Sequence, residues 1–203
     1  MSSIFFFADI VGIIAFSISG FLVAIRNQLD ILGILIASSL TALGGGVLRD
    51  AILSRDPFAF TAFYPSVVLS ATILILFVSK LYKKETIEQK WIFVVSDTMG
   101  LVAFSITGSL LAIDASFNTF GIIILGFVTA VGGGVIRDIM INRVPAVLVS
   151  DFYGSIAIIV SLLVVLFSYI DLLNEYTMLG IATFSVALRL LAYKQKWHLP
   201  KII

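Results

Sequence analysis

The chain is 203 residues long, with 60% hydrophobic and 12% charged residues, a net charge of +1 and a mean hydropathy of +1.14. A soluble domain carries roughly 25% charged residues, so the composition excludes a water-facing surface and predicts an integral membrane protein. The absence of cysteine excludes disulfides and thiolate metal sites, and the near-neutral charge gives no basic surface for nucleic acid. We expect no enzyme and no cofactor, because the single histidine, His198, lies far from any motif that supplies a nucleophile.

Seven charge-poor stretches are long enough to cross a bilayer, which takes about 20 apolar residues per helix. They predict helices at residues 4–26, 31–54, 62–80, 91–113, 119–142, 150–171 and 175–194. Only residues 81–90 have the composition of a polar loop, and the alternating segments typical of a β-barrel are absent from the sequence. The predicted fold class is therefore an all-α membrane protein with seven transmembrane helices.

The sequence repeats itself after 88 residues. Residues 9–25 match 97–113 and residues 41–50 match 129–138, and from 9 to 57 there are 23 identities in 49 positions without a gap. Each repeat holds three predicted helices, an odd number, so we expect the second copy to enter the membrane from the opposite side, as in many transport proteins. The chain then divides into a first three-helix repeat (4–80), a second, inverted three-helix repeat (91–171), a seventh helix (175–194) and a cytoplasmic tail (195–203).

Basic residues predict the orientation of these helices, because cytoplasmic loops carry an excess of lysine and arginine. With the N-terminus outside, the inner segments hold Arg26, Arg143 and the lysines of the 81–90 loop and of the tail. The outer segments are mainly acidic, with Asp56, Asp114, Asp171 and Glu175. We therefore predict an outer N-terminus and a cytoplasmic C-terminus. Lys80, Lys83 and Lys84 are placed either to contact anionic lipid or to lie in a solvated loop.

Two glycine triplets, Gly44, Gly45 and Gly46 and Gly132, Gly133 and Gly134, lie inside the second and fifth predicted helices. Each glycine costs about 1 kcal/mol against alanine within a helix, so the triplets need an explanation. One is close packing, in which small residues let two helices cross tightly. The other is a helix break that releases backbone carbonyls to coordinate a cation, which is tolerated at membrane depth only inside protein or beside a cavity. Both explanations stay open at this point.

Six charged residues lie within or beside the predicted spans, where a charge at a helix centre costs at least ~2.5–3.5 kcal/mol. They are Asp9, Arg49, Asp50, Asp97, Arg137 and Asp138. Neighbours at i and i+1 do not face each other on a helix, and Asp9 and Arg49 share a depth. We therefore predict interhelical pairs Asp9–Arg49 and Asp97–Arg137. Asp50 and Asp138 then remain either to attract a cation at each mouth of a path or to extend to the interface.

The first and fourth helices share one more pattern. Asp9, Gly12, Phe16 and Gly20 recur as Asp97, Gly100, Phe104 and Gly108 on one helix face. Phe16 and Phe104 are predicted either to form a hydrophobic constriction or to pack in the core. Hydroxyls flank this face and precede the triplets, and they either hydrate a pore or bond to backbone within their helices. These are Ser17, Ser19, Ser105, Thr107, Thr41 and Thr129.

The paired motifs GGGVLRD and GGGVIRD, in a chain of two three-helix repeats and a seventh helix, resemble the prokaryotic branch of the trimeric intracellular cation channel (TRIC) family. The resemblance spans about residues 4–195. It implies a homotrimer in a bacterial or archaeal cell membrane, with a pore in each subunit for monovalent cations, above all potassium. Helices one, two, four and five would line that pore, and the second and fifth would kink at the glycine triplets. No metal beyond a transient monovalent cation is implied.

Three functions compete. The first is a potassium-permeable channel, and the second is a secondary transporter of a small solute such as glycine, since inverted repeats with broken helices suit both. The third is a structural or assembly protein of the membrane. Electrical recording from the purified protein separates a channel, which gives unitary currents, from a carrier, which gives saturable uptake without them.

Overall fold

The computed structural model describes residues 3–80, 88–149 and 152–197, and these residues form helices and connecting segments without a strand. In chain order the helices are α1 (Ser3–Arg26), α2 (Ile31–Ile52), α3 (Phe58–Thr61), α4 (Phe63–Lys80), α5 (Glu88–Asp114), α6 (Thr119–Met140), α7 (Ala146–Val149), α8 (Tyr153–Tyr169) and α9 (Glu175–Lys194). Most of the predicted polar loop, residues 81–87, lies outside the described residues, as do residues 198–203 of the tail.

The seven long helices correspond to the seven predicted ones, with ends that differ by at most three residues. Five of them, α1, α2, α5, α6 and α9, are long and apolar enough to cross a membrane, whereas α4 and α8 provide shorter apolar stretches, Phe63–Ser79 and Tyr153–Tyr169. The protein is thus an all-α, multi-pass membrane protein. The count of seven crossings stays a prediction.

Short polar side chains fix where several helices begin. The Asp30 carboxylate accepts a hydrogen bond from the Gly33 amide at 2.7 Å, and Asn118, one repeat later, accepts from the Gly121 amide at 2.8 Å. Such side chains satisfy amides that the first turn of a helix leaves without a partner. The equivalent starts of α2 and α6 therefore follow from equivalent caps.

Two short helices, α3 and α7, were not predicted. The carbonyl of Pro57 accepts from the Phe60 amide at 2.9 Å, and the carbonyl of Pro145 accepts from the Leu148 amide at 2.9 Å. Proline is tolerated in the first turn of a helix, because a backbone N–H at that position would have no hydrogen-bond partner within the helix. Both prolines thus begin the next element, whereas α2 and α6 end several residues earlier.

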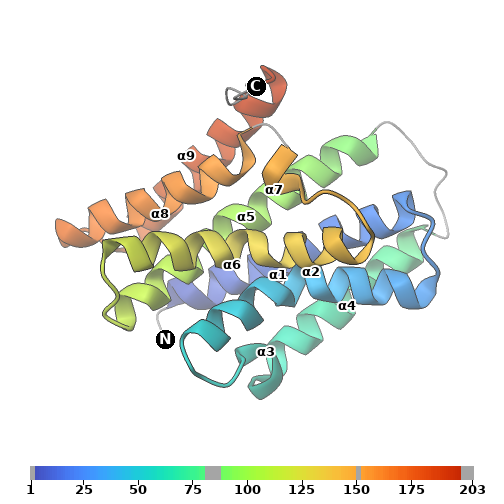
Figure 1. The fold of residues 1–203 in the computed structure, drawn as a ribbon, viewed down its shortest axis with the longest axis horizontal. Helices are drawn as coiled ribbons and strands as arrows, with labels where there is room; N and C mark the ends of the chain where they lie inside the picture. The colour runs from blue at the N-terminus through green and yellow to red at the C-terminus, as the bar shows by residue number, and fades with distance from the viewer. Residues whose placement is uncertain (1–2, 81–87, 150–151, 198–203) are drawn as a thin grey trace.

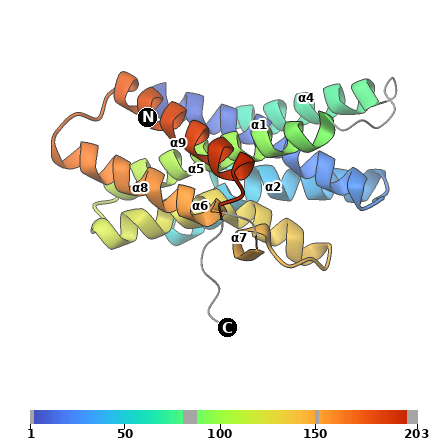
Figure 2. The ribbon, with the colours of Figure 1, turned by 90° about the horizontal axis from the view of Figure 1, so that it is seen from above.

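Four helices form the centre of the molecule. Helices α1 and α6 each pack against both α2 and α5, so the four make a closed ring, and α4 lies against α1 while α8 and α9 lie against α5 (Figures 1 and 2). The largest hydrophobic cluster joins this ring to α4, α8 and α9. The ring is the part of the fold that holds most of the predicted site residues.

The two repeats pack against each other in opposite chain directions (Figure 1). A Cβ atom on Gly12 of α1 would meet the Phe104 ring of α5, and one on Gly100 of α5 would meet the Phe16 ring of α1. Early residues of one helix thus face late residues of the other, and each contact maps onto the other when the sequence is shifted by 88 residues. This pseudo-two-fold packing is what an inverted second copy requires.

Candidate functional site

The glycine triplets lie at the crossing of α2 and α6. Both helices are continuous through the triplets, and no glycine in the described residues has a positive φ. A Cβ atom on Gly45 would meet the Thr129 carbonyl oxygen, and one on Gly133 would meet the Thr41 carbonyl oxygen. The predicted helix break is therefore wrong for this structure, because the glycines are needed to bring two intact helix backbones into contact.

The third glycine of each triplet has a different neighbour. At Gly46 the nearest atom to an added Cβ would be Arg49 Nη2 at 3.7 Å, and at Gly134 it would be Arg137 Nη2 at 3.7 Å. These positions leave space beside guanidinium groups instead of beside a second helix. An added methyl group there makes only ordinary van der Waals contact.

The first group of buried charges, the Asp9 cluster, consists of Asp9, Arg49, Asp50, Arg55 and Tyr64. Arg49 Nη1 lies 3.7 Å from Asp9 Oδ1, and the Tyr64 hydroxyl donates to Asp9 Oδ2 at 2.9 Å. Asp9 is 5% exposed and Arg49 2% exposed. The predicted interhelical pair Asp9–Arg49 is confirmed, and Tyr64 is an additional partner that the sequence did not reveal.

Asp50 is not a bare carboxylate. It accepts from Arg49 Nε at 2.8 Å, from Arg55 Nη2 at 2.6 Å and from the Phe58 amide at 2.8 Å, and it is 1% exposed. The expectation that Arg49 does not neutralise its neighbour is wrong, because the long arginine side chain folds back along its own helix. In this conformation Asp50 thus offers no open charge to a cation at the mouth of a path.

The second group, the Asp97 cluster, consists of Ser19, Asp97, Arg137, Asp138 and Tyr153. Within the described part of the chain no direct ion pair joins Asp97 to Arg137. Instead, the Ser19 hydroxyl donates to Asp97 Oδ1 at 2.7 Å and accepts from Arg137 Nη1 at 3.2 Å. The predicted direct pair is corrected to a pair bridged by Ser19, since α1 places that hydroxyl between the two charges.

The rest of the Asp97 cluster repeats the pattern around Asp50. Arg137 Nε donates to Asp138 Oδ1 at 2.8 Å, and the Ala146 amide donates to Asp138 Oδ2 at 3.0 Å. Asp138 is 5% exposed, so it too is neutralised by its neighbour. Tyr153 interacts electrostatically with Asp97, and Tyr64 donates to Asp9 in the other cluster. The 88-residue shift aligns Tyr64 with Phe152, and this one-residue slip hides the tyrosine pair in the sequence.

Phe16 and Phe104 form a ring pair between the two clusters. Their centroids are 5.3 Å apart at an interplanar angle of 73°, and the rings are 1% and 2% exposed. Each ring covers a glycine of the opposite helix. The pair belongs to the hydrophobic core and at the same time closes the space between α1 and α5, so both predicted roles are compatible with its position.

Most of the predicted pathway hydroxyls bond to their own helices. Each donates to a carbonyl three or four residues earlier in the chain, at 2.6 Å for Ser17, Thr41 and Thr129 and at 3.2 Å for Thr107. Such bonds satisfy a buried hydroxyl without any water. Ser105 Oγ is buried and has no partner among the described residues, and Ser19 alone of the six bridges charged groups.

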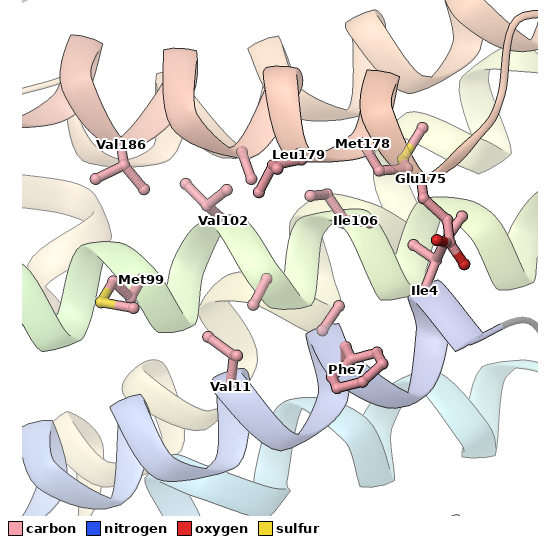
Figure 3. A pocket seen from close by; sticks show the side chains of 13 residues that line it. Ile4, Phe7, Val11, Met99, Val102, Ile106, Glu175, Met178, Leu179 and Val186 are labelled. Atoms are coloured by element: carbon pink, nitrogen blue, oxygen red, sulfur yellow. The ribbon is translucent and has the colours of Figure 1, made fainter.

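Two apolar grooves run along the outside of α1 and α5. The first has a volume of about 440 Å³ and lies under α9, between Met178 and Val186 (Figure 3). The second, of about 590 Å³, lies beside Trp91. Val11 and Met99, which are equivalent in the two repeats, line both grooves. Because almost all of the lining side chains are apolar, these grooves suit hydrocarbon and are not an ion path.

Comparison with known proteins places the chain in a family. The family model described as Glycine transporter matches residues 6–80 and 94–169, one segment in each repeat. The UPF0126 membrane protein YvgT of Bacillus subtilis (strain 168) is 34% identical to the chain over 95% of it and 93% of the relative. The UPF0126 inner membrane protein YadS of Escherichia coli (strain K12) is 30% identical over 96% of the chain and 93% of the relative.

Comparison with solved structures identifies this family. A structure described as the structural basis for conductance through TRIC cation channels has 32% sequence identity and a TM-score of 0.83, and covers 97% of this chain and 96% of its own. The crystal structure of a prokaryotic TRIC channel in 0.5 M KCl has 28% identity and a TM-score of 0.86 over 98% and 100%. The chain belongs to the TRIC channel family. The TRIC motifs recognised in the sequence, GGGVLRD and GGGVIRD, thus contain the α2–α6 crossing and the arginine–aspartate pairs of both clusters.

Proposed function

We propose that this TRIC-family chain is a cation channel whose path runs inside one subunit, within the ring of α1, α2, α5 and α6. The observation that carries the proposal is the placement of two buried charge clusters inside this ring, related by the pseudo-two-fold packing. Intramembrane charges are expensive and usually mark ion pathways. The solved relatives are named as cation channels, which supports the same activity here.

The path is closed in this conformation. The Asp9 cluster closes one end, the Asp97 cluster closes the other, and the Phe16–Phe104 pair fills the middle. Opening requires the guanidinium groups to leave the aspartates and the two rings to part. The carboxylates and the hydroxyls of Ser17, Ser19, Ser105, Thr107, Thr41 and Thr129 would then face the path, with the glycine triplets setting the distance between α2 and α6.

The permeant ion, the number of subunits and the orientation in the membrane are inferred from the resemblance to TRIC channels and from the distribution of lysines. We infer that potassium is the main permeant ion and that three subunits assemble, each with its own path. The lysine bias supports an outer N-terminus and a cytoplasmic C-terminus in a bacterial or archaeal cell membrane. Membrane lipid surrounds the seven spans and fills the two apolar grooves.

A secondary transporter of a small solute such as glycine is the alternative, and the description of the matching family model favours it. A transporter holds its solute in a binding cavity near the midplane. The cavity between Asp9 and Arg49 has a volume of only about 20 Å³. That is room for one water and not for an amino acid, whereas a cavity of about 310 Å³ beside Arg137 is larger. Cavity size therefore does not separate the two functions, and the names of the solved relatives make the channel the better supported proposal.

Recording from the purified protein in planar bilayers with potassium chloride tests the proposal. We expect discrete unitary currents that reverse at the cation equilibrium potential under a salt gradient. A Gly180→Ala variant is a matched control, because a methyl group added there meets nothing within 4 Å. Saturable glycine uptake by proteoliposomes without unitary currents would establish the transporter instead.

A further inference from the structure

Ser19 and Thr107 occupy equivalent positions in the two repeats, 88 residues apart. Both are fully buried. The α1–α5 contacts keep one antiparallel register, in which Gly12 faces Phe104, Phe16 faces Gly100 and Ser19 faces Asp97. The same register places Thr107 opposite Asp9. Each cluster therefore has one hydroxyl residue across from its aspartate.

The two hydroxyls are used differently. Ser19 links Asp97 to Arg137, with hydrogen bonds of 2.7 Å and 3.2 Å. Thr107 instead donates to the carbonyl of Phe104 in its own helix at 3.2 Å. The bridging position between Asp9 and Arg49 is therefore not taken by a side-chain hydroxyl.

The consequence appears at Arg49. Its Nη1 is 3.7 Å from Asp9 Oδ1, longer than a hydrogen bond, and it has no hydrogen-bond partner among the described residues. The arginine is 2% exposed, and its Cζ lies 5.5 Å from the centroid of the Phe5 ring. A buried hydrogen-bond donor that belongs to a charged group and has no acceptor is costly. We therefore expect an acceptor beside this nitrogen.

A cavity adjoins the atoms that lack the bridge. It has a volume of about 20 Å³ and is lined by Asp9 and Arg49 together with Ile13, Gly46 and Pro65, among others. A buried water needs at least about 10–15 Å³ and two to four polar partners. The site offers a donor in Arg49 Nη1 and acceptors in the Asp9 carboxylate, so it meets both requirements for one water.

We propose that one ordered water occupies this cavity, accepts from Arg49 Nη1 and donates to Asp9 Oδ1. It takes the place that the Ser19 hydroxyl has in the Asp97 cluster. The two ends of the ring are then held differently, one by a hydroxyl that is part of the chain and the other by an exchangeable molecule. The water site itself does not depend on the proposed function.

Radiolytic footprinting tests the site directly, because hydroxyl radicals formed from a bound water oxidise the side chains beside it. Ile13 lines the cavity and is 2% exposed, and its equivalent in the other repeat, Leu101, is 0% exposed. In the unaltered protein we expect oxidation of Ile13 severalfold above that of Leu101. Equal protection of the two residues overturns the proposal.

A Ser19→Ala variant extends the test. Removing the hydroxyl leaves Asp97 and Arg137 without their bridge, so we expect a water to enter and the oxidation of Leu101 to rise to the level of Ile13. A Thr107→Ala variant is the control, because the Thr107 hydroxyl bonds only within its helix, and it leaves Ile13 labelled as before. Ile13 labelling that appears only in Thr107→Ala, and not in the unaltered protein, would show that Thr107, not a water, completes the Asp9 cluster. If Ser19→Ala fails to fold, a high-resolution density map of the unaltered protein decides the point. Density for a water between Arg49 and Asp9 supports the proposal, and its absence overturns it.

Discussion

The tight contact between α2 and α6 at the glycine triplets can be tested by adding a single methyl group. In Gly45→Ala the new Cβ would meet the Thr129 carbonyl oxygen of α6. That oxygen belongs to helix backbone and cannot rotate away, so α2 and α6 must move apart. In Gly46→Ala, one position later, the new Cβ has Arg49 Nη2 as its nearest atom at 3.7 Å, an ordinary contact. The two variants thus add the same group to the same helix in different surroundings.

The expected magnitudes follow from two opposing effects. Overpacking a tight contact costs about 1–3 kcal/mol, and it applies only to Gly45→Ala. Replacing a helical glycine by alanine gains about 1 kcal/mol, and it applies to both variants because neither glycine has a positive φ. Gly45→Ala is therefore expected to be about 1–3 kcal/mol less stable than Gly46→Ala. At roughly 2–4 °C per kcal/mol for a chain of this size, the melting temperatures should differ by about 2–12 °C.

The assay is thermal unfolding of the purified variants in one detergent, with Gly133→Ala and Gly134→Ala as the equivalent pair in the second repeat. Both pairs should show the same order, since a Cβ on Gly133 would meet the Thr41 carbonyl oxygen. Equal melting temperatures for Gly45→Ala and Gly46→Ala would refute the close-packing argument. A loss of stability in all four variants would instead point to a special backbone conformation in the triplets.

Four further outcomes are expected. Asp9→Asn and Arg49→Gln should each lower the free energy of unfolding by about 3–5 kcal/mol. In thermal denaturation the double variant should lose clearly less stability than the sum of the two single losses, and additive losses would contradict the pair. Phe104→Ala should lower the free energy of unfolding by about 3–5 kcal/mol and raise the unitary conductance in bilayers. Unchanged currents would show that the Phe104 side chain only packs in the core and does not close a path. A phosphatase reporter fused after the C-terminus should be inactive, and periplasmic activity would reverse the predicted orientation. Crosslinking in native membranes should give a ladder that stops at three subunits, and one that stops at two would exclude the trimer.

The features that the sequence could predict are those repeated in both halves. The identical spacing of Asp9 and Arg49 from their helix ends was enough to predict their contact, because depth in a membrane follows directly from position in a helix. The helix starts at Asp30 and Asn118 were equally readable, since each cap lies three residues before a glycine amide. The depth rule thus predicted the Asp9–Arg49 pair, whereas the same pair carried over by the repeat, Asp97–Arg137, is bridged by Ser19.

The parts that could not be predicted depend on side-chain conformation. The reach of Arg49 back to Asp50 needs the rotamer of a long side chain, which no spacing rule gives. The insertion of Ser19 between Asp97 and Arg137 needs the register of α1 against α5. Three glycines in a row suggested a break from composition alone, whereas their purpose is visible only when the backbone of the partner helix is in place.

The two repeats differ in the space that surrounds their charge clusters. Beside Arg137 a cavity of about 310 Å³ opens between α2 and α6, lined by Ala37 and Leu29 among others. At the equivalent positions the second repeat has Leu125 and Phe117, and these larger side chains pack with Leu53 at the place where the cavity would be. The Asp97 end thus combines a wide approach with a bridge made by the protein, and the Asp9 end combines a filled approach with room for one water. The sequence that the two repeats share builds the two-fold frame, and positions that differ, such as Ala37 against Leu125 and Ser19 against Thr107, make its two ends different.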